Sequence, residues 1–177
     1  MKTLIVLAYL AAIVAANVVT ASFAPLSIGA LLVPAGSFLI GATFILRDFV
    51  QRAIGRGRTY AAIAGALALS AATSYALGDT LWIVFASAVT FLVSETLDTE
   101  TYTRLKLPLA SRVFFSGLVG GLVDSALFVV VGLSPLGAGF LPWDAVPFAI
   151  AGQMLVKTAM QALGAAAVAV SPLGRAR

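Results

Sequence analysis

The sequence contains no cysteine and no histidine, and only 10% of its residues are charged. Without these two residue types a disulfide framework and the usual zinc and iron sites cannot form. Nucleophilic catalysis by a Ser–His or Cys–His pair is excluded for the same reason. Since a soluble domain carries roughly 25% charged residues, the scarcity of charge also argues against a surface that faces water.

Apolar residues dominate instead, at 61% of the 177 residues. A soluble protein of this length cannot hide that much apolar area, because its surface must stay mostly polar. We therefore predict an integral membrane protein. The net charge of +4 does not indicate a nucleic-acid partner, because the basic residues lie between apolar runs and are better explained by membrane topology.

Six apolar segments are long enough to cross a bilayer, which takes about 20 mostly apolar residues per helix. We predict an all-α fold, a bundle of six transmembrane helices in a single domain over residues 1–177. The expected spans are Thr3–Phe23, Leu31–Phe49, Tyr60–Leu77, Leu81–Leu97, Arg112–Val131 and Pro147–Val170. The longest basic connection is expected at Thr99–Leu109.

The distribution of basic residues predicts the orientation of these spans. With six spans, every Lys and Arg except Lys157 falls on one side of the membrane, and the other side carries Asp79 and Asp144. The basic residues on the first side are Lys2, Arg47, Arg52, Arg56, Arg58, Arg104, Lys106, Arg112, Arg175 and Arg177. The positive-inside rule then places both termini in the cytoplasm. We expect a multi-pass protein of the bacterial inner membrane.

Small residues recur at four-residue spacing on two of the expected helices. Ala8, Ala12 and Ala16 do so on the first, and Gly117 and Gly121 on the fifth. Such patterns let helix backbones approach closely. They are explained either by packing inside the bundle or, for the alanines, by a face that docks a partner helix or a second copy as a homodimer.

Two charged residues, Asp124 and Lys157, lie in the middle of the fifth and sixth spans. A charge at the bilayer centre costs about 2.5–3.5 kcal/mol on insertion scales, so such residues normally face a bundle interior or a watery cavity. One interpretation is an ion pair that joins the two helices, and the other is the lining of a substrate cavity. The two interpretations are compatible, because a site can be built around such a pair.

Other polar residues extend this candidate site. Gln153 and Gln161 flank Lys157 at four-residue spacing and form a polar stripe on the sixth helix. Asn17 lies in the first span and forms either an interhelical hydrogen bond or a ligand contact. The remaining candidates, which lie either at the membrane interface or in an Arg–Asp network near the cytoplasmic mouth, are Arg47, Asp48, Glu95 and Asp98.

We predict that the substrate-binding residues are Asp124, Lys157, Gln153, Asn17, Asp48 and Asp98. We expect no catalytic residue, no cofactor and no metal site, since a carboxylate metal site at Asp48, Glu95 and Asp98 would lack a spaced ligand motif. Carboxylate and amide groups suit a neutral or zwitterionic heterocycle, and an aromatic side chain in the cavity would stack on a planar ring.

Four local patterns carry a resemblance to a known family. The second span ends PAGSFLIGATFILRDFVQRAIGR, with Asp48, Arg52 and Gly55, and the fourth ends SETLDTETYTRLK, with Asp98 and Tyr102. The fifth contains VDSALF and the sixth contains its single Lys. In these motifs the chain resembles the queuosine precursor transporters of the YhhQ type, also called the VUT or vitamin uptake transporter family.

The resemblance implies a six-helix transporter, not an enzyme, that imports 7-cyano-7-deazaguanine or its aminomethyl form for the queuosine modification of tRNA. In such a site Asp124 would accept hydrogen bonds from the amino and ring N–H groups of the base, and Lys157 would donate to its carbonyl. The alternative is a substrate-binding subunit, similar to an S-component, of an energy-coupling-factor importer. That subunit would dock its partner through the face of Ala8, Ala12 and Ala16.

Overall fold

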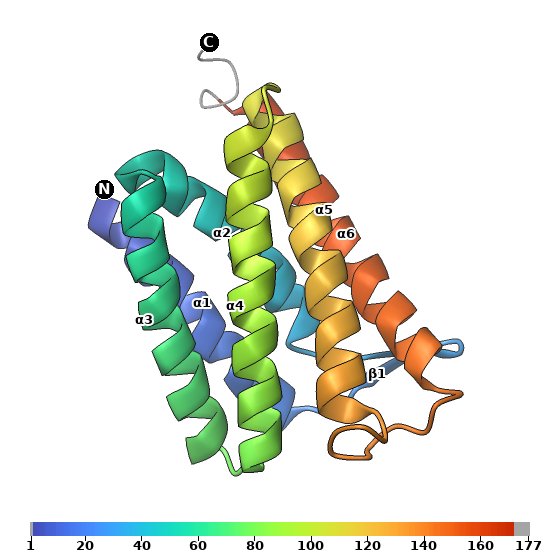
Figure 1. Ribbon diagram of the computed structural model, residues 1–177. Coiled ribbons are helices and arrows are strands. Elements are labelled where there is room, and N and C mark those ends of the chain that lie inside the picture. Colours follow the sequence, from blue (N-terminus) through green and yellow to red (C-terminus); the bar gives the residue numbers. More distant parts are fainter. Residues whose placement is uncertain (1, 172–177) are drawn as a thin grey trace.

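The computed structural model describes residues 2–171, which form six α-helices, one π-helix and a two-stranded hairpin (Figure 1). The helices are α1 (Lys2–Ser22), α2 (Ser37–Ile54), α3 (Arg56–Ala76), α4 (Leu81–Arg104), α5 (Leu109–Leu127), the π-helix η1 (Phe128–Leu133) and α6 (Val146–Val170). The strands are β1 (Leu26–Ile28) and β2 (Leu31–Val33). The predicted all-α membrane fold is confirmed.

Helix α2 lies at the centre of the bundle, where it contacts each of the other five α-helices. The other helices surround it in the order α1, α3, α4, α5, α6, and each packs against the next. By length and hydropathy, α1, α4, α5 together with η1, and α6 can each cross a membrane. Helices α2 and α3 are not in that group. In α2 the polar side chains of Arg47, Asp48 and Gln51 are buried against neighbouring helices.

The second predicted span, Leu31–Phe49, is wrong at both ends. Its first residues belong to the antiparallel hairpin, in which Leu26 pairs with Val33 and Ile28 pairs with Leu31. Gly29 makes the turn with a φ of 61°, a conformation that favours glycine. Pro34 then disfavours a helix at the residue before it, so α2 begins at Ser37 although the sequence is apolar throughout.

The fourth predicted span is also too short. Helix α4 continues to Arg104 instead of ending at Leu97, so the predicted connection Thr99–Leu109 shrinks to residues 105–108. The polar residues after Leu97 suggested a loop, but Asp98, Thr99 and Tyr102 are buried against neighbouring helices. At the other end of the bundle α5 passes into η1, and Trp82 Nε1 donates to the Val131 carbonyl at 2.9 Å.

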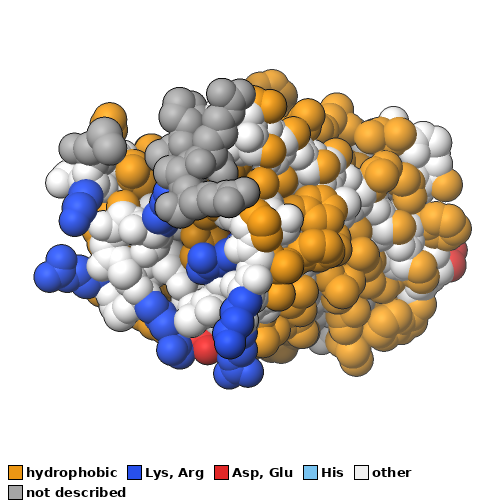
Figure 2. Space-filling view, turned by 90° about the horizontal axis from the view of Figure 1, so that it is seen from above, with side chains coloured by type: hydrophobic (Ala, Val, Ile, Leu, Met, Phe, Trp, Pro, Cys, Tyr) orange, Lys and Arg blue, Asp and Glu red, His pale blue; other side chains and the backbone are white. Residues whose placement is uncertain are grey.

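One end of the bundle carries the basic residues, as the predicted topology requires. The bounds of the helices bring Lys2, Arg56 and Arg104 to the same end, and Figure 2, which looks onto this end, shows Lys and Arg side chains gathered there. Arg175 and Arg177 lie outside the described residues. Which side of the membrane this end faces stays a prediction.

The small residues of α5 serve packing inside the bundle. A Cβ at Gly117 would collide with the Gln161 side chain of α6, and one at Gly121 would lie 3.4 Å from Lys157 Cβ. The alanine stripe of α1 behaves differently along its length. Ala8 is exposed, Ala12 is half-buried and Ala16 is buried, so the stripe turns from the surface into the bundle. Docking of a partner on it stays a prediction.

Candidate functional site: a cavity beside a buried charge cluster

A cavity of about 440 Å³ lies between the helices, with lining residues from all six α-helices. This volume falls within the range of about 300–1,000 Å³ that is usual for small-molecule sites. Its polar lining residues are Asn17, Thr20, Ser37, Ser70, Ser74, Asp79, Ser87, Thr90, Asp124, Gln153 and Lys157. The hairpin side of the bundle contributes Pro25 and Pro34, so the cavity lies toward the end opposite the basic residues.

Asp124 and Lys157 form an ion pair in the wall of this cavity, with Lys157 Nζ 2.5 Å from Asp124 Oδ2. The same Nζ donates to Ser125 Oγ and to Gln153 Oε1, both at 3.0 Å. These three contacts match the three N–H donors of an ammonium group. Asp124 is 15% exposed and Lys157 only 2%, so the carboxylate faces the cavity and the ammonium lies behind it. The ion pair between the two helices is confirmed, and it lines a cavity, whereas the role of these residues in binding substrate stays a prediction.

Two groups of the wall retain capacity to bind a ligand. Asp124 Oδ1 accepts a long hydrogen bond of 3.4 Å from Ser94 Oγ. Gln153 Nε2 is buried and has no hydrogen-bond partner among the described residues. Because both side chains contact Lys157 Nζ, an acceptor and a donor without a partner among the described residues lie close to one ammonium group. A buried donor without a partner is costly, which favours a ligand acceptor at this place.

The outer part of the cavity is also polar. Asn17 Nδ2 donates to the carbonyl and to the hydroxyl of Ser70, both at 3.1 Å, so Asn17 makes an interhelical hydrogen bond and lines the cavity as well. Ser74 Oγ donates to Asp79 at 2.5 Å. Asp79 is not among the predicted site residues, although an acidic residue on the side without Lys or Arg is a signal that could have identified it.

Aromatic side chains supply the flat apolar part of the lining. Phe23, Phe91, Phe128 and Phe140 all line the cavity. Phe128 is the first residue of η1, and π-helical turns occur often at functional sites. Any of these rings can stack on a planar cargo.

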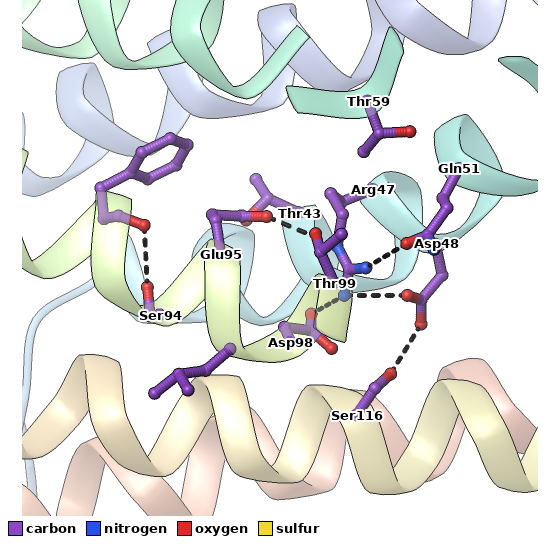
Figure 3. A network of polar contacts seen from close by, with 12 residues as sticks. Thr43, Arg47, Asp48, Gln51, Thr59, Ser94, Glu95, Asp98, Thr99 and Ser116 are labelled. Atoms are coloured by element: carbon purple, nitrogen blue, oxygen red, sulfur yellow. Dashed lines mark hydrogen bonds and ion pairs between the residues drawn. The ribbon is translucent and has the colours of Figure 1, made fainter. Parts of the chain in front are cut away.

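A second polar group lies deeper in the bundle and does not line the cavity (Figure 3). Arg47 of α2 contacts the carboxylates of Asp48 at 2.9 Å, Glu95 at 3.5 Å and Asp98 in a closer ion pair. All four side chains are at most 1% exposed. We call these four residues the Arg47 cluster. The four residues form the Arg–Asp network of the second alternative, and its place near a cytoplasmic mouth stays a prediction.

Further hydrogen bonds tie the Arg47 cluster to its neighbours. Arg47 Nη1 donates to Gln51 Oε1 at 3.0 Å, and Gln51 Nε2 donates to Thr103 Oγ1 at 2.8 Å. From α5, Ser116 Oγ donates to Asp48 Oδ2 at 3.2 Å. Arg47 contacts all three carboxylates, and its single positive charge balances one of their three negative charges.

The structure thus brings four of the six predicted site residues to one cavity, namely Asn17, Asp124, Gln153 and Lys157. Asp48 and Asp98 lie apart from it in the Arg47 cluster. The polar stripe of α6 is divided in the same way. Gln153 lines the cavity, whereas Gln161 is fully buried and donates to the Gly41 carbonyl at 2.7 Å.

Residues 62–170 match the family model described as "putative vitamin uptake transporter". The chain belongs to this family. The match includes Glu95, Asp98, Asp124 and Lys157, and thus the ion pair of the cavity wall together with the α4 half of the Arg47 cluster. No curated protein and no solved structure matches the chain significantly. As a vitamin uptake transporter, the protein has a cavity reached by all six α-helices and a polar wall that suits a small polar cargo.

Proposed function

We propose that the protein imports a 7-deazaguanine base, 7-cyano-7-deazaguanine or its aminomethyl form, across the bacterial inner membrane. The observation that carries this proposal is the pairing of Asp124 with the free Gln153 donor at one ammonium group. A guanine-type edge presents an amino group and a ring N–H beside a carbonyl oxygen. A carboxylate accepts from the first two, and an amide N–H donates to the third.

In this arrangement Lys157 positions the two recognition groups rather than contacting the cargo. Its three donors are engaged with Asp124, Ser125 and Gln153, so a bond to the cargo would break one of them. The donor to the carbonyl of the base is therefore Gln153 Nε2, and Lys157 balances the charge of Asp124. This assignment replaces the direct Lys157 contact that the sequence led us to expect.

The charges of the lining support a neutral or cationic cargo. The charged residues that line the cavity are Asp79, Asp124 and Lys157, so negative charge exceeds positive charge by one. An anionic cargo would meet this excess without a compensating cation. The aminomethyl form, which is cationic at neutral pH, would gain from Asp79 near the cavity mouth.

A binding experiment tests this recognition. Calorimetric titration of the purified protein would compare 7-aminomethyl-7-deazaguanine with the same base lacking its 2-amino group. Hydrogen bonds to a charged group contribute about 1.5–3 kcal/mol, so we expect roughly ten- to hundredfold weaker binding of the second compound. In Asp124→Asn this discrimination should largely disappear, whereas Asp144→Asn, an exposed acidic residue outside the lining, should keep it.

Biotin and riboflavin serve as competing vitamins in the same titration. Tighter binding of either vitamin than of both deazaguanines would refute the proposed cargo. Equal discrimination in the wild type and in Asp124→Asn would leave the cargo in place but remove Asp124 from its recognition.

A further inference from the structure

The Arg47 cluster holds more acid than base. Three carboxyl groups, those of Asp48, Glu95 and Asp98, surround one guanidinium, and none of these side chains is more than 1% exposed. If all were ionised, the cluster would carry two uncompensated negative charges away from water. Buried charges without a partner are so unfavourable that the group normally neutralises instead. Elementary electrostatics therefore requires bound protons or another cation at this place.

Charged groups on the surrounding elements do not remove this excess. Lys157 of α6 is paired with Asp124 of α5. Arg112 of α5 lies 4.0 Å from the centre of the Tyr102 ring and donates to the Tyr102 carbonyl at 3.0 Å. Arg52 of α2 lies toward the basic end with an exposed side chain, and the ion pairs of the three carboxylates among the described residues are made with Arg47 and not with Arg52. The positive charge in contact with the three carboxylates is that of Arg47.

The hydroxyl of a tyrosine on a third helix is buried next to the Arg47 cluster. Tyr9 of α1 is fully buried, and its hydroxyl has no hydrogen-bond partner in the part of the chain that the structure describes. It lies against Glu95. Asp98 Oδ1 and Thr99 Oγ1 are likewise buried without a hydrogen-bond partner among residues 2–171. The hydroxyls of Tyr9 and Thr99 each bring one donor hydrogen but no positive charge, so they can hydrogen-bond to a carboxyl group without neutralising it.

The cluster lies next to the cavity, one helical turn beyond its lining. On α4, Thr90 and Phe91 line the cavity and Ser94 donates to Asp124. Glu95 follows Ser94 directly. On α5, a Cβ at Gly120 would lie 2.9 Å from Asp98 Cβ, so the glycine lets the cluster pack close to the helix that carries Asp124. The cluster thus closes the bundle between the cavity and the basic end.

We infer that the Arg47 cluster binds the proton that is transported together with the cargo, and that Glu95 exchanges this proton with the cavity. The inference rests on the proposed function in taking the cavity as the cargo site. A proton from cavity water forms an O–H bond on a Glu95 carboxylate oxygen, which removes one negative charge and weakens the attraction to Arg47. Because this attraction joins α2 to α4, its loss loosens the closed end of the bundle, and the proton leaves toward the basic end.

A proton fits this place better than a metal ion or sodium. Arg47 contacts all three carboxylates, and a second cation among them would meet the guanidinium at short range. A proton, by contrast, attaches to one oxygen and needs no shell of ligands. Ionisable residues within a membrane bundle commonly serve as proton relays in transporters.

Transport by the purified protein in sealed vesicles tests the inference, with 7-aminomethyl-7-deazaguanine as the cargo and no other protein present. We expect an acidic exterior to drive accumulation of the cargo in the wild type, and a protonophore to abolish it. Glu95→Gln should still exchange labelled for unlabelled cargo but lose accumulation driven by the proton gradient. Glu100→Gln is the matched control, because it removes an acid of the same helix that lies outside the cluster.

Infrared spectroscopy supplies a readout that is independent of cargo. A protonated carboxyl group has a C=O stretch that an ionised one lacks, and the wild type should show it at neutral pH. The intensity of this band should fall in Glu95→Gln or Asp98→Asn and should stay unchanged in Glu100→Gln.

Absence of this band at neutral pH in the wild type would overturn the inference, and so would accumulation driven by a sodium gradient instead of a proton gradient. If deazaguanines are not transported but the band is present and sensitive to Glu95, the cargo is wrong and the proton site stands. If Glu95→Gln does not fold, the wild-type band and Asp98→Asn decide the question.

Discussion

The two ionic sites of the bundle differ in charge balance and in access to water. Asp124 and Lys157 form a pair of equal and opposite charges, and Asp124 is 15% exposed toward the cavity. The Arg47 cluster sets three carboxyl groups against one guanidinium and is sealed to within 1% exposure. A balanced pair at a wet wall can stay ionised and present fixed hydrogen-bonding groups. A buried cluster with excess negative charge cannot stay fully ionised, so we expect its carboxyl groups to bind and release protons.

The two sites also join different helices. The pair links α5 to α6, which the glycines of α5 bring close together. The Arg47 cluster links the central helix α2 to α4. Recognition of cargo and closure of the bundle are thereby assigned to separate contacts, and Ser94, which donates to Asp124 and precedes Glu95, connects them.

The sharpest way to break this comparison is to remove the positive charge from each site. Arg47→Leu leaves three buried carboxyl groups without a cation, and loss of one partner from a buried ion pair typically costs about 3–5 kcal/mol. Lys157→Met leaves one carboxylate that still reaches the cavity, so its cost should be smaller. Chemical unfolding of the purified proteins in detergent measures both losses in the free energy of unfolding.

A second change to the cluster makes this prediction specific. Adding Asp98→Asn to Arg47→Leu removes one of the carboxyl groups that have lost their cation, so the double variant should recover part of the lost stability. Equal losses for Arg47→Leu and Lys157→Met would show that the two sites are alike and would remove the basis of the contrast.

The six helices were predictable from the apolar segments together with the pattern of Lys and Arg, although only four helices of the described part of the chain reach the length and hydropathy of a membrane span. The hairpin Leu26–Val33 was not predictable, because its residues are as apolar as those of a membrane helix and Pro34 was the remaining signal against a helix. The end of α4 was missed for the opposite reason. Its last two turns are polar, and only the packing of α2 and α5 against Asp98 and Tyr102 keeps them helical and buried.

The candidate site could be predicted in part. Asp124 and Lys157 stand out in the sequence because a charged residue within an apolar helix is costly in a membrane and usually has a functional role. That Lys157 has its three donors engaged, or that Asp48 and Asp98 converge on Arg47, depends on how α2 packs at the centre of the bundle. Spacing along one helix cannot show which residues of another helix it meets.

The polar stripe of α6 offers a smaller test of wet against dry positions. Gln161→Ala leaves the buried Gly41 carbonyl without its partner, which should cost about 1–3 kcal/mol of stability and leave cargo affinity unchanged. Gln153→Ala removes a cavity-lining side chain whose buried Nε2 has no hydrogen-bond partner among the described residues. It should weaken cargo binding by up to about tenfold, since a neutral hydrogen bond contributes about 0.5–1.5 kcal/mol, with a lesser effect on stability.

Unfolding and calorimetric titration of both variants measure the two effects side by side. The two residues are both glutamines and lie eight positions apart on one helix, so each is the matched control of the other. Loss of cargo affinity in Gln161→Ala with none in Gln153→Ala would move the recognition site away from the cavity described above.

The smallest effect is expected at the ionic group that already faces water. Glu100 of α4 lies 2.6 Å from Arg56, 2.5 Å from the Tyr60 hydroxyl and 3.6 Å from Arg104, and the two arginines are 52% and 80% exposed. Solvent and salt screen such contacts, and exposed ion pairs contribute little to stability. Glu100→Gln should therefore shift the thermal midpoint slightly at low salt and not at high salt, with cargo affinity and proton-driven accumulation as in the wild type. Thermal unfolding at two ionic strengths measures this shift. If Glu100→Gln lost as much stability as Arg47→Leu, burial would not explain why the Arg47 cluster matters more for stability than the exposed group at Glu100.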